Sequence, residues 1–292
     1  MIASTQAWMQ KVGSWNYLWR MGYRQFVKRI LARDLSLKLA NGRKVFLPRT
    51  SQFSSVAWVT GGRVDDGFEE LLRWFAPKGT TFFDVGAHFG FYSVFLADLH
   101  SSVVAFEPDE RTLPALQRNL AAIPGAVLVR AAVSNRVGRM RFVSAASSPQ
   151  SHLESKGETR GWKEAVEVEV TTLDATWRKL GQPVVGTVKI DTEGHEGAVL
   201  WGGQQMIRHC RPQLLVEATA QSLAAHCGWL GAAGYRAVML GERRHGRRQR
   251  VQIVTMDEVE GNFTEGMILL LPETARKMPR WVNLQALYVT FA

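Results

Sequence analysis

The chain has 292 residues, a formal net charge of +10 and 46% hydrophobic residues. This composition excludes general disorder, and the length suits one large domain or a domain with an extension. Two cysteines, Cys210 and Cys227, are too few for a disulfide framework, which favours a reducing compartment. No apolar run reaches the roughly 18 residues of a transmembrane helix, and the first residues lack a secretory pattern. We therefore expect a cytoplasmic protein whose positive charge favours acidic partners.

Residues 1–33 have the pattern of an amphipathic helix. Trp15, Trp19 and Tyr23 alternate with Lys and Arg, which suits the surface of a membrane. The same pattern also fits a helix packed on its own domain or on a second subunit of a homo-oligomer. Residues 36–40 and 44–48 alternate in period two around Asn41-Gly42, which predicts a β-hairpin. We interpret residues 1–64 as an N-terminal extension and residues 65–292 as the main domain.

The most informative segment comes next, after a short predicted helix over residues 65–75. A Phe-rich strand ends in Asp84, turns through Gly86 and Gly90, and continues as a helix from Phe91. Such a unit presents backbone N–H groups at the carboxyl end of a sheet, where nucleotide-like ligands bind. The turn lacks the middle glycine of a dinucleotide site and the Gly-Lys-Ser/Thr of a P-loop. Asp84 would repel phosphate but suits an ammonium or sulfonium group, and S-adenosylmethionine (SAM) carries both.

The following strand supports this interpretation. Residues 102–106 are apolar and lead into Glu107-Pro108, 23 residues after Asp84. An acid at this position is well placed to accept hydrogen bonds from ribose hydroxyls. The spacing of Asp84 and Glu107 therefore favours a SAM site over an ordinary α/β unit whose acids cap helices.

Beyond this unit, apolar strands alternate with helical segments. We predict strands near residues 126–129, 139–143, 166–170, 187–191, 213–216, 236–240 and 267–271, and helices near residues 110–121, 173–180, 195–201 and 220–233. Residues 144–164 are rich in Ser, Gly and charge and predict a loop. The alternation predicts an α/β fold with a mostly parallel sheet and helices on both faces.

A second cluster of titratable residues follows the strand near 187–191. Asp191, Glu193, His195 and Glu196 crowd into six positions where this strand gives way to a helix. Such crowding at the rim of a site suits proton transfer or metal binding, whereas acids at a helix start are also ordinary caps. Glu217 ends the next strand along the chain.

The sequences DVGAHFGFYS at residues 84–93 and KIDTEGHE at residues 189–196 resemble the FkbM-type family of SAM-dependent methyltransferases. The resemblance covers roughly residues 65–220 and includes further matches at residues 106–108, 132–134, 171–174 and 214–217. It implies a Rossmann-like, seven-stranded class I methyltransferase sheet and O-methylation of a hydroxyl. Sugars and natural-product scaffolds are frequent acceptors in that family, but the motifs do not fix the acceptor.

The resemblance also implies roles for individual residues. The residues expected to bind SAM are Asp84, Gly86, Ala87, His88, Gly90, Glu107, Pro108, Ala132, Val133, Ser134 and Asp191. The candidates for catalysis are Asp191, His195 and Glu193, with Asp191 or His195 as the base that takes the proton of the acceptor hydroxyl. Alternatively, Asp191, Glu193 and Glu217 hold a Mg²⁺ ion that acidifies vicinal hydroxyls.

The leading hypothesis is a SAM-dependent O-methyltransferase that acts on a carbohydrate, a glycolipid or a natural product. A first alternative is methylation of RNA or another polyanion, gripped by the basic run at residues 243–250. That run also fits a solvated loop, and no RNA-binding module is recognisable. A second alternative is a non-catalytic protein of the membrane surface that retains a methyltransferase-like fold.

Overall fold

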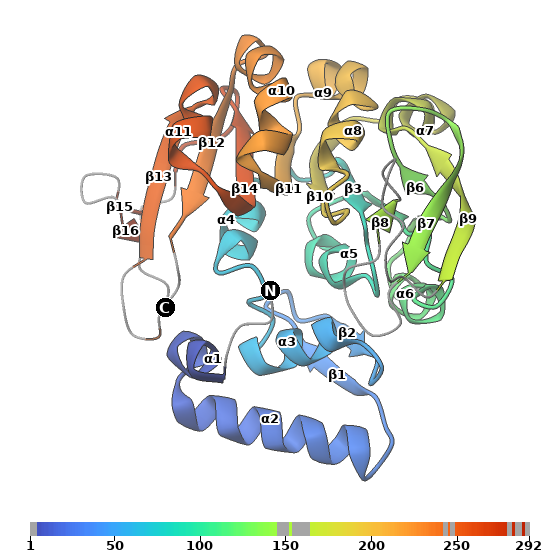
Figure 1. The fold of residues 1–292 in the computed structure, drawn as a ribbon, viewed down its shortest axis with the longest axis vertical. Helices are drawn as coiled ribbons and strands as arrows, with labels where there is room; N and C mark the ends of the chain where they lie inside the picture. Colours follow the sequence, from blue (N-terminus) through green and yellow to red (C-terminus); the bar gives the residue numbers. More distant parts are fainter. Residues whose placement is uncertain are drawn as a thin grey trace.

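The computed structural model describes residues 5–144, 152–153, 164–241, 245, 249–278, 282–283 and 288–289. Its centre is one ten-stranded sheet, in which five neighbouring strands are parallel (Figure 1). In spatial order these are β5 (Val127–Val129), β4 (Ser102–Phe106), β3 (Thr81–Val85), β10 (Val185–Ile190) and β11 (Gln213–Thr219). The order reverses at β3, so the carboxyl ends of β3 and β10 flank a topological switch point.

The sheet continues past β11 with strands of mixed direction. β14 (Glu265–Pro272) runs antiparallel between β11 and β12 (Tyr235–Leu240). These seven strands have the order and the antiparallel member of a class I methyltransferase sheet, which confirms the expected fold class. Three further strands, which the sequence analysis did not assign to the sheet, extend this edge: β13 (Gln249–Thr255), β16 (Tyr288–Val289) and β15 (Val282–Asn283).

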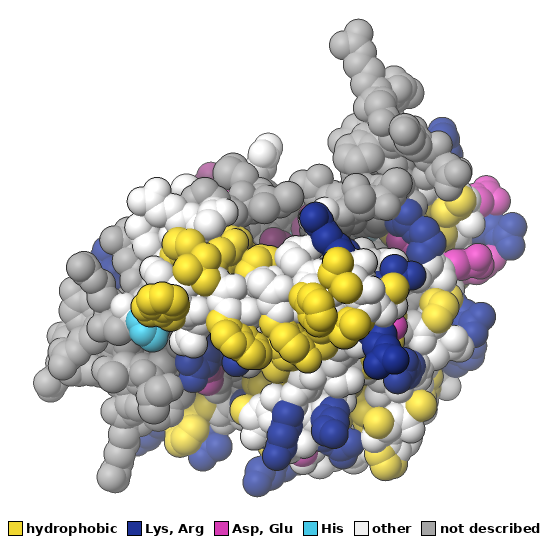
Figure 2. All heavy atoms as spheres, turned by 90° about the horizontal axis from the view of Figure 1, so that it is seen from below, with side chains coloured by type: hydrophobic (Ala, Val, Ile, Leu, Met, Phe, Trp, Pro, Cys, Tyr) yellow, Lys and Arg dark blue, Asp and Glu magenta, His cyan; other side chains and the backbone are white. Residues whose placement is uncertain are grey.

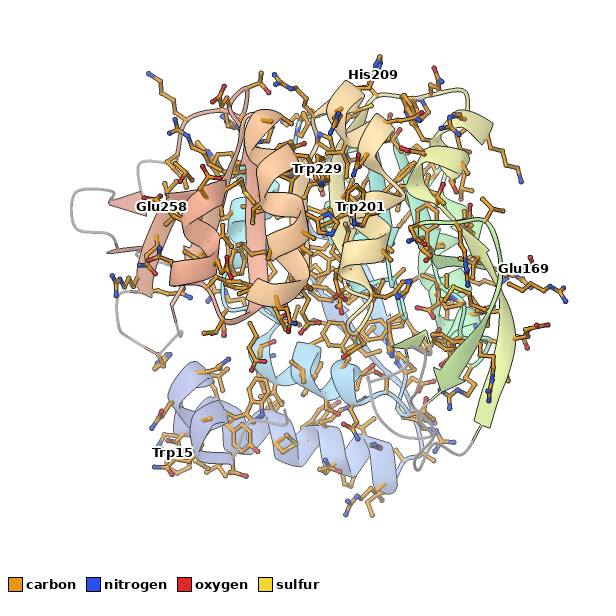
Figure 3. All side chains as sticks on the ribbon, turned by 45° about the horizontal axis from the view of Figure 1, so that its top comes forward. Trp15, Glu169, Trp201, His209, Trp229 and Glu258 are labelled. Carbon is orange, nitrogen blue, oxygen red and sulfur yellow. The ribbon has the colours of Figure 1, made fainter. Side chains whose placement is uncertain are left out.

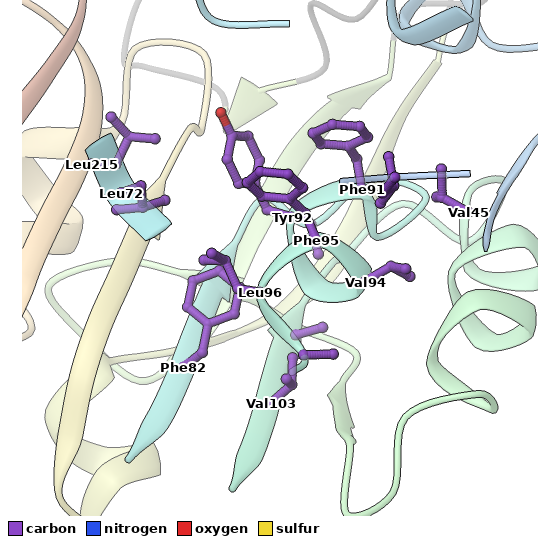
Figure 4. Close-up of a cluster of buried hydrophobic side chains, with 14 of the residues drawn as sticks. Val45, Leu72, Phe82, Phe91, Tyr92, Val94, Phe95, Leu96, Val103 and Leu215 are labelled. Carbon is purple, nitrogen blue, oxygen red and sulfur yellow. The ribbon is translucent and has the colours of Figure 1, made fainter. Parts of the chain in front are cut away.

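Helices cover both faces of the sheet because neighbouring residues of each strand point to opposite sides. Phe82 packs with one apolar cluster and Phe83 with the other. The first face carries α4 (Phe68–Phe75), α5 (Phe91–Leu96) and α6 (Leu113–Leu120). Figure 4 shows Leu96 of α5 against Phe82, and Leu72 beside Leu215, within this cluster. The second face carries α7 (Leu173–Lys179), α8 (Glu196–Trp201), α9 (Gln204–Cys210) and α10 (Ala220–Ala232).

A separate four-stranded sheet lies beside β5. It contains β6 (Ala132–Val133), β9 (Glu164–Thr171), β7 (Gly138–Ser144) and β8 (His152–Leu153). The predicted loop over residues 144–164 lies largely outside the described residues. After β13, η1 (Met256–Glu258) and α11 (Val259–Asn262) pack on α10 and lead into β14.

The N-terminal segment lies across the carboxyl ends of the central strands (Figure 1). It consists of α1 (Thr5–Val12), α2 (Ser14–Arg29), the hairpin β1 (Leu35–Lys38) and β2 (Lys44–Leu47), and α3 (Gln52–Thr60). The expected helix is therefore broken at Gly13, whose φ of +85° departs from helical geometry. Among the described residues, no helix combines the length and apolarity needed to cross a membrane.

Buried polar side chains fasten this segment to the main domain. The Asn119 amide of α6 accepts the Phe46 N–H (2.8 Å) and donates to the carbonyls of Phe46 (3.0 Å) and Phe89 (2.7 Å). Arg24 of α2 is fully buried and donates to the Pro48 carbonyl (3.0 Å). These contacts fix the hairpin beside the glycine turn and α2 beneath α3.

Candidate active site

The turn after β3 brings its backbone unusually close to the strand next to it. Gly86 and Ala87 both donate to the Phe106 carbonyl, at 3.1 and 3.0 Å. Gly86 has φ +72°, and a Cβ at this position would lie 1.8 Å from the Asp191 carbonyl oxygen. Only glycine satisfies both the left-handed backbone and this approach. Gly90 caps α5, where a Cβ would lie 2.8 Å from Leu116, so its role is packing behind the turn.

Asp84 presents an unsatisfied carboxylate oxygen at this turn. Its Oδ2 accepts the Ser93 hydroxyl at 2.7 Å, whereas Oδ1 is buried and has no hydrogen-bond partner among the described residues. Burial raises the pKa of Asp84, and the Lys189 ammonium and the Ser93 hydroxyl counteract that rise. A buried acceptor without a donor is costly, so this oxygen is suited to a ligand that brings a cation or an N–H group.

Glu107 joins the glycine turn to the end of β4. One carboxylate oxygen accepts the His88 N–H at 2.8 Å, and the other accepts the Asp109 N–H at 2.9 Å. Burial raises the pKa of Glu107 to about 7, against these two backbone hydrogen bonds. Each oxygen keeps a further lone pair, so the pair of oxygens can still receive two hydroxyls of a ribose.

These residues line a cavity of about 690 Å³ at the carboxyl ends of β3, β4, β10 and β11. Most of the residues expected to form the site do line it: Asp84, Gly86, Ala87, His88, Glu107, Pro108, Ala132, Val133, Asp191, Glu193, His195 and Glu217. Gly90 and Ser134 are not among the lining residues. The cavity is large enough for a nucleoside-sized ligand.

Ser134 does not line the cavity but contacts His195, which does. Its buried hydroxyl lies 2.8 Å from Nε2 of His195. Burial lowers the pKa of His195, and the Arg136 charge adds to this effect. The imidazole is therefore neutral and oriented by Ser134, on the side of the cavity that Ala132 and Val133 also line.

His88 occupies the centre of the glycine turn with φ 50°, in the left-handed region. Its ring meets Phe53 edge-on at a centroid distance of 6.0 Å, and its Nδ1 is buried without a partner among the described residues. Burial lowers the pKa of His88 to about 4, so the imidazole is neutral at pH 7. Its backbone N–H, which binds Glu107, has the better defined structural role.

The second acidic cluster gathers as the sequence indicates. The carboxyl oxygens of Asp191, Glu193 and Glu217 lie within 4.8 Å of one another. The Asp191 charge, followed by burial and by their shared hydrogen bond, raises the pKa of Glu217 to about 9. Burial and the neighbouring acids raise the pKa of Glu193 to about 7. At neutral pH, therefore, Glu217 is protonated and Glu193 lies near its midpoint.

The loop that carries Glu193 is held by Glu196. One oxygen of Glu196 accepts the N–H groups of Thr192 and Gly194 and the Thr192 hydroxyl, each at 3.0 Å. Glu196 is buried and has a structural role, although capping was expected of Asp191 and Glu193; the residue at the N-cap of α8 is His195, without a side-chain cap hydrogen bond. Glu193 has φ 55°, a left-handed conformation that is unfavourable for a glutamate and that this network maintains.

Lys189 is the main cation beneath the site, although the sequence analysis assigned it no role. Its ammonium is buried, 2.7 Å from Asp191 Oδ2 and 3.4 Å from the Gly86 carbonyl. Burial favours the neutral amine, but Asp191 and Asp84 outweigh it and raise the pKa of Lys189. For Asp191 burial has the opposite sign and raises the pKa, but the Lys189 charge and the Glu217 hydrogen bond outweigh it, so the pKa of Asp191 is lowered. The two groups therefore form an ion pair that keeps Asp191 ionised.

The N-terminal segment contributes a wall that sequence reasoning did not find. Pro48, Gln52, Phe53 and Val56 line the cavity opposite the strand ends, and so does Asp65, which follows α3. The Asp65 carboxylate accepts the hydroxyl of Tyr92, and burial raises the pKa of this acid to about 6. No motif marks these positions, because they meet the strand ends only in the folded chain.

Comparison with known proteins identifies the family. The model of the methyltransferase FkbM domain matches residues 84–237, more than half of the chain. The chain belongs to the FkbM methyltransferase family. The match agrees with the resemblance carried by the glycine turn and by the acidic run at residues 189–196. No curated protein sequence matches the chain significantly.

Solved structures include FkbM and other methyltransferases. An FkbM methyltransferase from Methylobacillus flagellatus is 14% identical at a TM-score of 0.43, over 75% of this chain and 54% of that one. The chain thus spans about half the length of that protein. An rRNA methylase from Streptococcus thermophilus is 10% identical at a TM-score of 0.40, over 70% and 93% of the two chains. A precorrin-6y C5,15-methyltransferase from Geobacter metallireducens is 14% identical at a TM-score of 0.37, over 70% and 86%.

The residues of this FkbM methyltransferase fit SAM. The unpaired Oδ1 of Asp84 suits the ammonium end, and the two oxygens of Glu107 suit the ribose hydroxyls. Because residue 86 is a glycine, no side chain covers the backbone of the turn at this point, and a ligand can approach it directly. The Asp191 cluster lines the same cavity on the side of β10 and β11.

Proposed function

We propose that this enzyme methylates a hydroxyl oxygen of a neutral, polyhydroxylated acceptor such as a carbohydrate or a glycolipid. The observation that carries the proposal is the acid cluster of Asp191, Glu193 and Glu217 at the edge of the cavity. A hydroxyl must lose its proton as it attacks, and a positioned base with a pKa near the working pH is effective.

The chemistry divides between cofactor and protein. SAM supplies a reactive methyl sulfonium when it is bound, so the protein mainly has to orient the two reactants. Glu193 has the pKa that suits the base, about 7, and its backbone is held in place by the Glu196 network. Asp191, kept ionised by Lys189, accepts a hydrogen bond from the acceptor or from Glu217. We assign His195 to the cofactor side because it is bonded to Ser134.

The charge of the cavity argues for a neutral acceptor. Among the described lining residues, seven are acids and two, Arg111 and Lys189, are permanent cations. The acids are Asp65, Asp84, Glu107, Asp109, Asp191, Glu193 and Glu217. Even with Glu217 protonated and Glu107 and Glu193 partly protonated, the lining keeps a negative excess that repels a phosphate backbone. Its carboxyl oxygens offer many hydrogen-bond acceptors to the hydroxyls of a sugar. The basic run proposed for RNA lies mostly outside the described residues, since only residues 245, 249 and 250 of it are described.

Lys189 also bears on the Mg²⁺ hypothesis. The three carboxyl groups have the oxygen ligands that Mg²⁺ prefers. However, the Lys189 ammonium already lies 2.7 Å from Asp191 Oδ2 and neutralises that carboxylate without a metal. We propose that transfer needs no divalent ion. Activity should therefore be unchanged in excess EDTA, and a loss that added Mg²⁺ restores would contradict this.

The decisive experiment is transfer from methyl-labelled SAM to three acceptor pools: neutral oligosaccharides, glycolipids and total RNA. We expect label in one of the first two pools, on an oxygen that fragmentation mass spectrometry identifies as a former hydroxyl. Label confined to RNA would favour the polyanion alternative. If calorimetry detected no binding of SAM, the protein would instead be the non-catalytic alternative.

A further inference from the structure

Helix α2 carries two apolar faces, of which only one is packed against the protein. Tyr17, Val27 and the buried Arg24 face inward. Trp15 and Trp19 lie on the other face with 86% and 65% of their surfaces exposed. Leu18, Tyr23, Phe26, Ile30 and Leu31 are exposed as well. Among the described residues, seven of the twelve exposed large apolar side chains thus lie within residues 15–31, which makes them a patch rather than scattered surface residues.

The patch has a cationic border. Figure 2 shows the row of apolar side chains along the underside of the molecule, with Lys and Arg side chains beside it. The first 33 residues contain no Asp or Glu and six Lys or Arg, of which Arg24 is buried on the inner face and Lys11 pairs with Asp66. Arg29 and Arg33 are exposed at the end of α2, and Arg49 is exposed on the neighbouring loop. Trp and Tyr flanked by such cations are the composition of helices that lie in a membrane interface.

We propose that the outer face of α2 docks the protein on an anionic lipid bilayer. The helix lies in the plane of the interface, with Trp15, Trp19, Phe26 and Ile30 among the acyl chains near the headgroups. At 16 residues it is about 24 Å long, which is too short to span the hydrocarbon core. This proposal does not depend on the acceptor or on methyl transfer.

Charge complementarity selects the bilayer over a second copy of the chain. A contact between two copies through this face would bring together two sets of cations without acids from α1 or α2 to balance them. An anionic lipid surface neutralises the same cations, and each Lys or Arg near it strengthens binding about fivefold. The patch is presented rigidly, because Arg24 donates to Ser55 of α3 and to the Pro48 carbonyl just before α3, and the partly exposed Tyr23 stacks on Trp58 of α3.

The test is flotation of the full chain with two kinds of vesicle, phosphatidylcholine alone and phosphatidylcholine mixed with phosphatidylglycerol. We expect binding to the anionic vesicles that weakens as salt is added, and little binding to the neutral ones. The double variant Trp15→Ser/Trp19→Ser should lose about tenfold or more in partition coefficient. Arg29→Glu reverses the charge, so its partition coefficient for anionic vesicles should fall by more than the fivefold expected when one positive charge is removed.

A matched control is Trp201→Ser. Trp201 is also exposed, at 50%, but it lies on α8, far from Trp15 in Figure 3. This variant should bind vesicles like the wild type, and all variants should keep the wild-type circular dichroism and SAM affinity. The proposal is overturned if the wild type ignores anionic vesicles or if the double variant binds them as well as the wild type. It is equally overturned if the wild type is a dimer in solution that the double variant converts to a monomer.

Discussion

The cavity has two walls of different character. The wall formed by the strand ends carries its ionisable groups at fixed positions, such as Asp84, Glu107 and Asp191. The wall formed by residues 48–65 offers mainly uncharged side chains, including Phe53 and Val56, and one acid, Asp65. The first wall is held by sheet hydrogen bonds and a buried ion pair, whereas the second rests on side-chain contacts such as Phe53 against Phe89. We propose from this contrast that the sheet wall sets the chemistry and that the N-terminal wall shapes the space for the acceptor.

The sharpest test of the sheet wall is Gly86→Ala. We expect it to abolish detectable SAM binding and to destabilise the fold by several kcal/mol, because its Cβ would overlap the Asp191 carbonyl oxygen. Gly79→Ala is a matched control, since Gly79 has φ +74° but no atom near its Cβ position. The control should cost only about 1–2 kcal/mol in urea unfolding and leave SAM binding intact. Equal effects of the two variants would show that the close approach is unimportant.

The next test is Lys189→Met. This change leaves Asp191 and Asp84 without their common cation, and removing one partner of a buried pair typically costs about 3–5 kcal/mol. We expect urea unfolding to show a loss of this order. Asp191 should also gain protons more readily. Wild-type stability of the variant would mean that the ion pair contributes nothing to the wall.

Glu193→Gln separates chemistry from binding. We expect kcat to fall about 100-fold or more, because a positioned base typically contributes this much. SAM affinity measured by calorimetry should change little. In the wild type, kcat should rise with pH through about 7 as Glu193 loses its proton, and the variant should lack this limb. A variant that keeps the full rate and the same pH profile would assign the base elsewhere.

The N-terminal wall is tested by Gln52→Ala. Gln52 is exposed and lines the cavity, so its loss should leave the fold and SAM affinity unchanged. If this wall contacts the acceptor, KM for the acceptor should rise about threefold to tenfold at constant kcat. A change in SAM affinity instead would place the cofactor against this wall.

The smallest expected effect concerns stability against pH. Glu217 has a folded pKa of about 9 against an ordinary 4.5, so between these values the folded state holds a proton that the unfolded state has lost. Stability therefore decreases as pH rises through this window. In Glu217→Gln the decrease should be shallower, and Tm near pH 9 should exceed that of the wild type. If stability decreased with pH as steeply in Glu217→Gln as in the wild type, the raised pKa of Glu217 would not contribute to the pH dependence of stability.

The sequence predicted the sheet wall better than the N-terminal wall for a physical reason. In the β3–α5 turn, the strand, the glycines and the acid are neighbours in the sequence, so this unit can be recognised without knowing the tertiary structure. The α3 helix was missed because its mixture of small and apolar residues shows no clear helical period. Asp65 and Tyr92 meet across 27 positions, a contact that no local pattern contains. The segment after Gly202-Gly203 was also missed, since Gly203 caps the new helix α9.

Site assignments follow the same division. The acids at residues 84, 107, 191, 193 and 217 could be anticipated at the cavity because each lies within three residues of the carboxyl end of a strand. Lys189 was overlooked because its position inside a buried strand looks like a core position, and only the fold reveals the carboxylates that hold its charge. The boundary expected at residue 64 stays a prediction, although residues on both sides of it line the cavity.

The three hydrogen bonds of the Asn119 side chain make the hairpin and the glycine turn parts of one cooperative unit. A ligand that orders Phe89 and the turn also strengthens the attachment of β2, and by reciprocity the attached segment raises the affinity for that ligand by the same factor. SAM should therefore slow amide hydrogen exchange not only in its own turn but also at Phe46, in a strand that does not line the cavity. Attachment of the N-terminal segment and binding of the cofactor are thus thermodynamically coupled. Loss of the segment would lower the affinity for the cofactor, although β2 contributes no residue to the lining of the cavity.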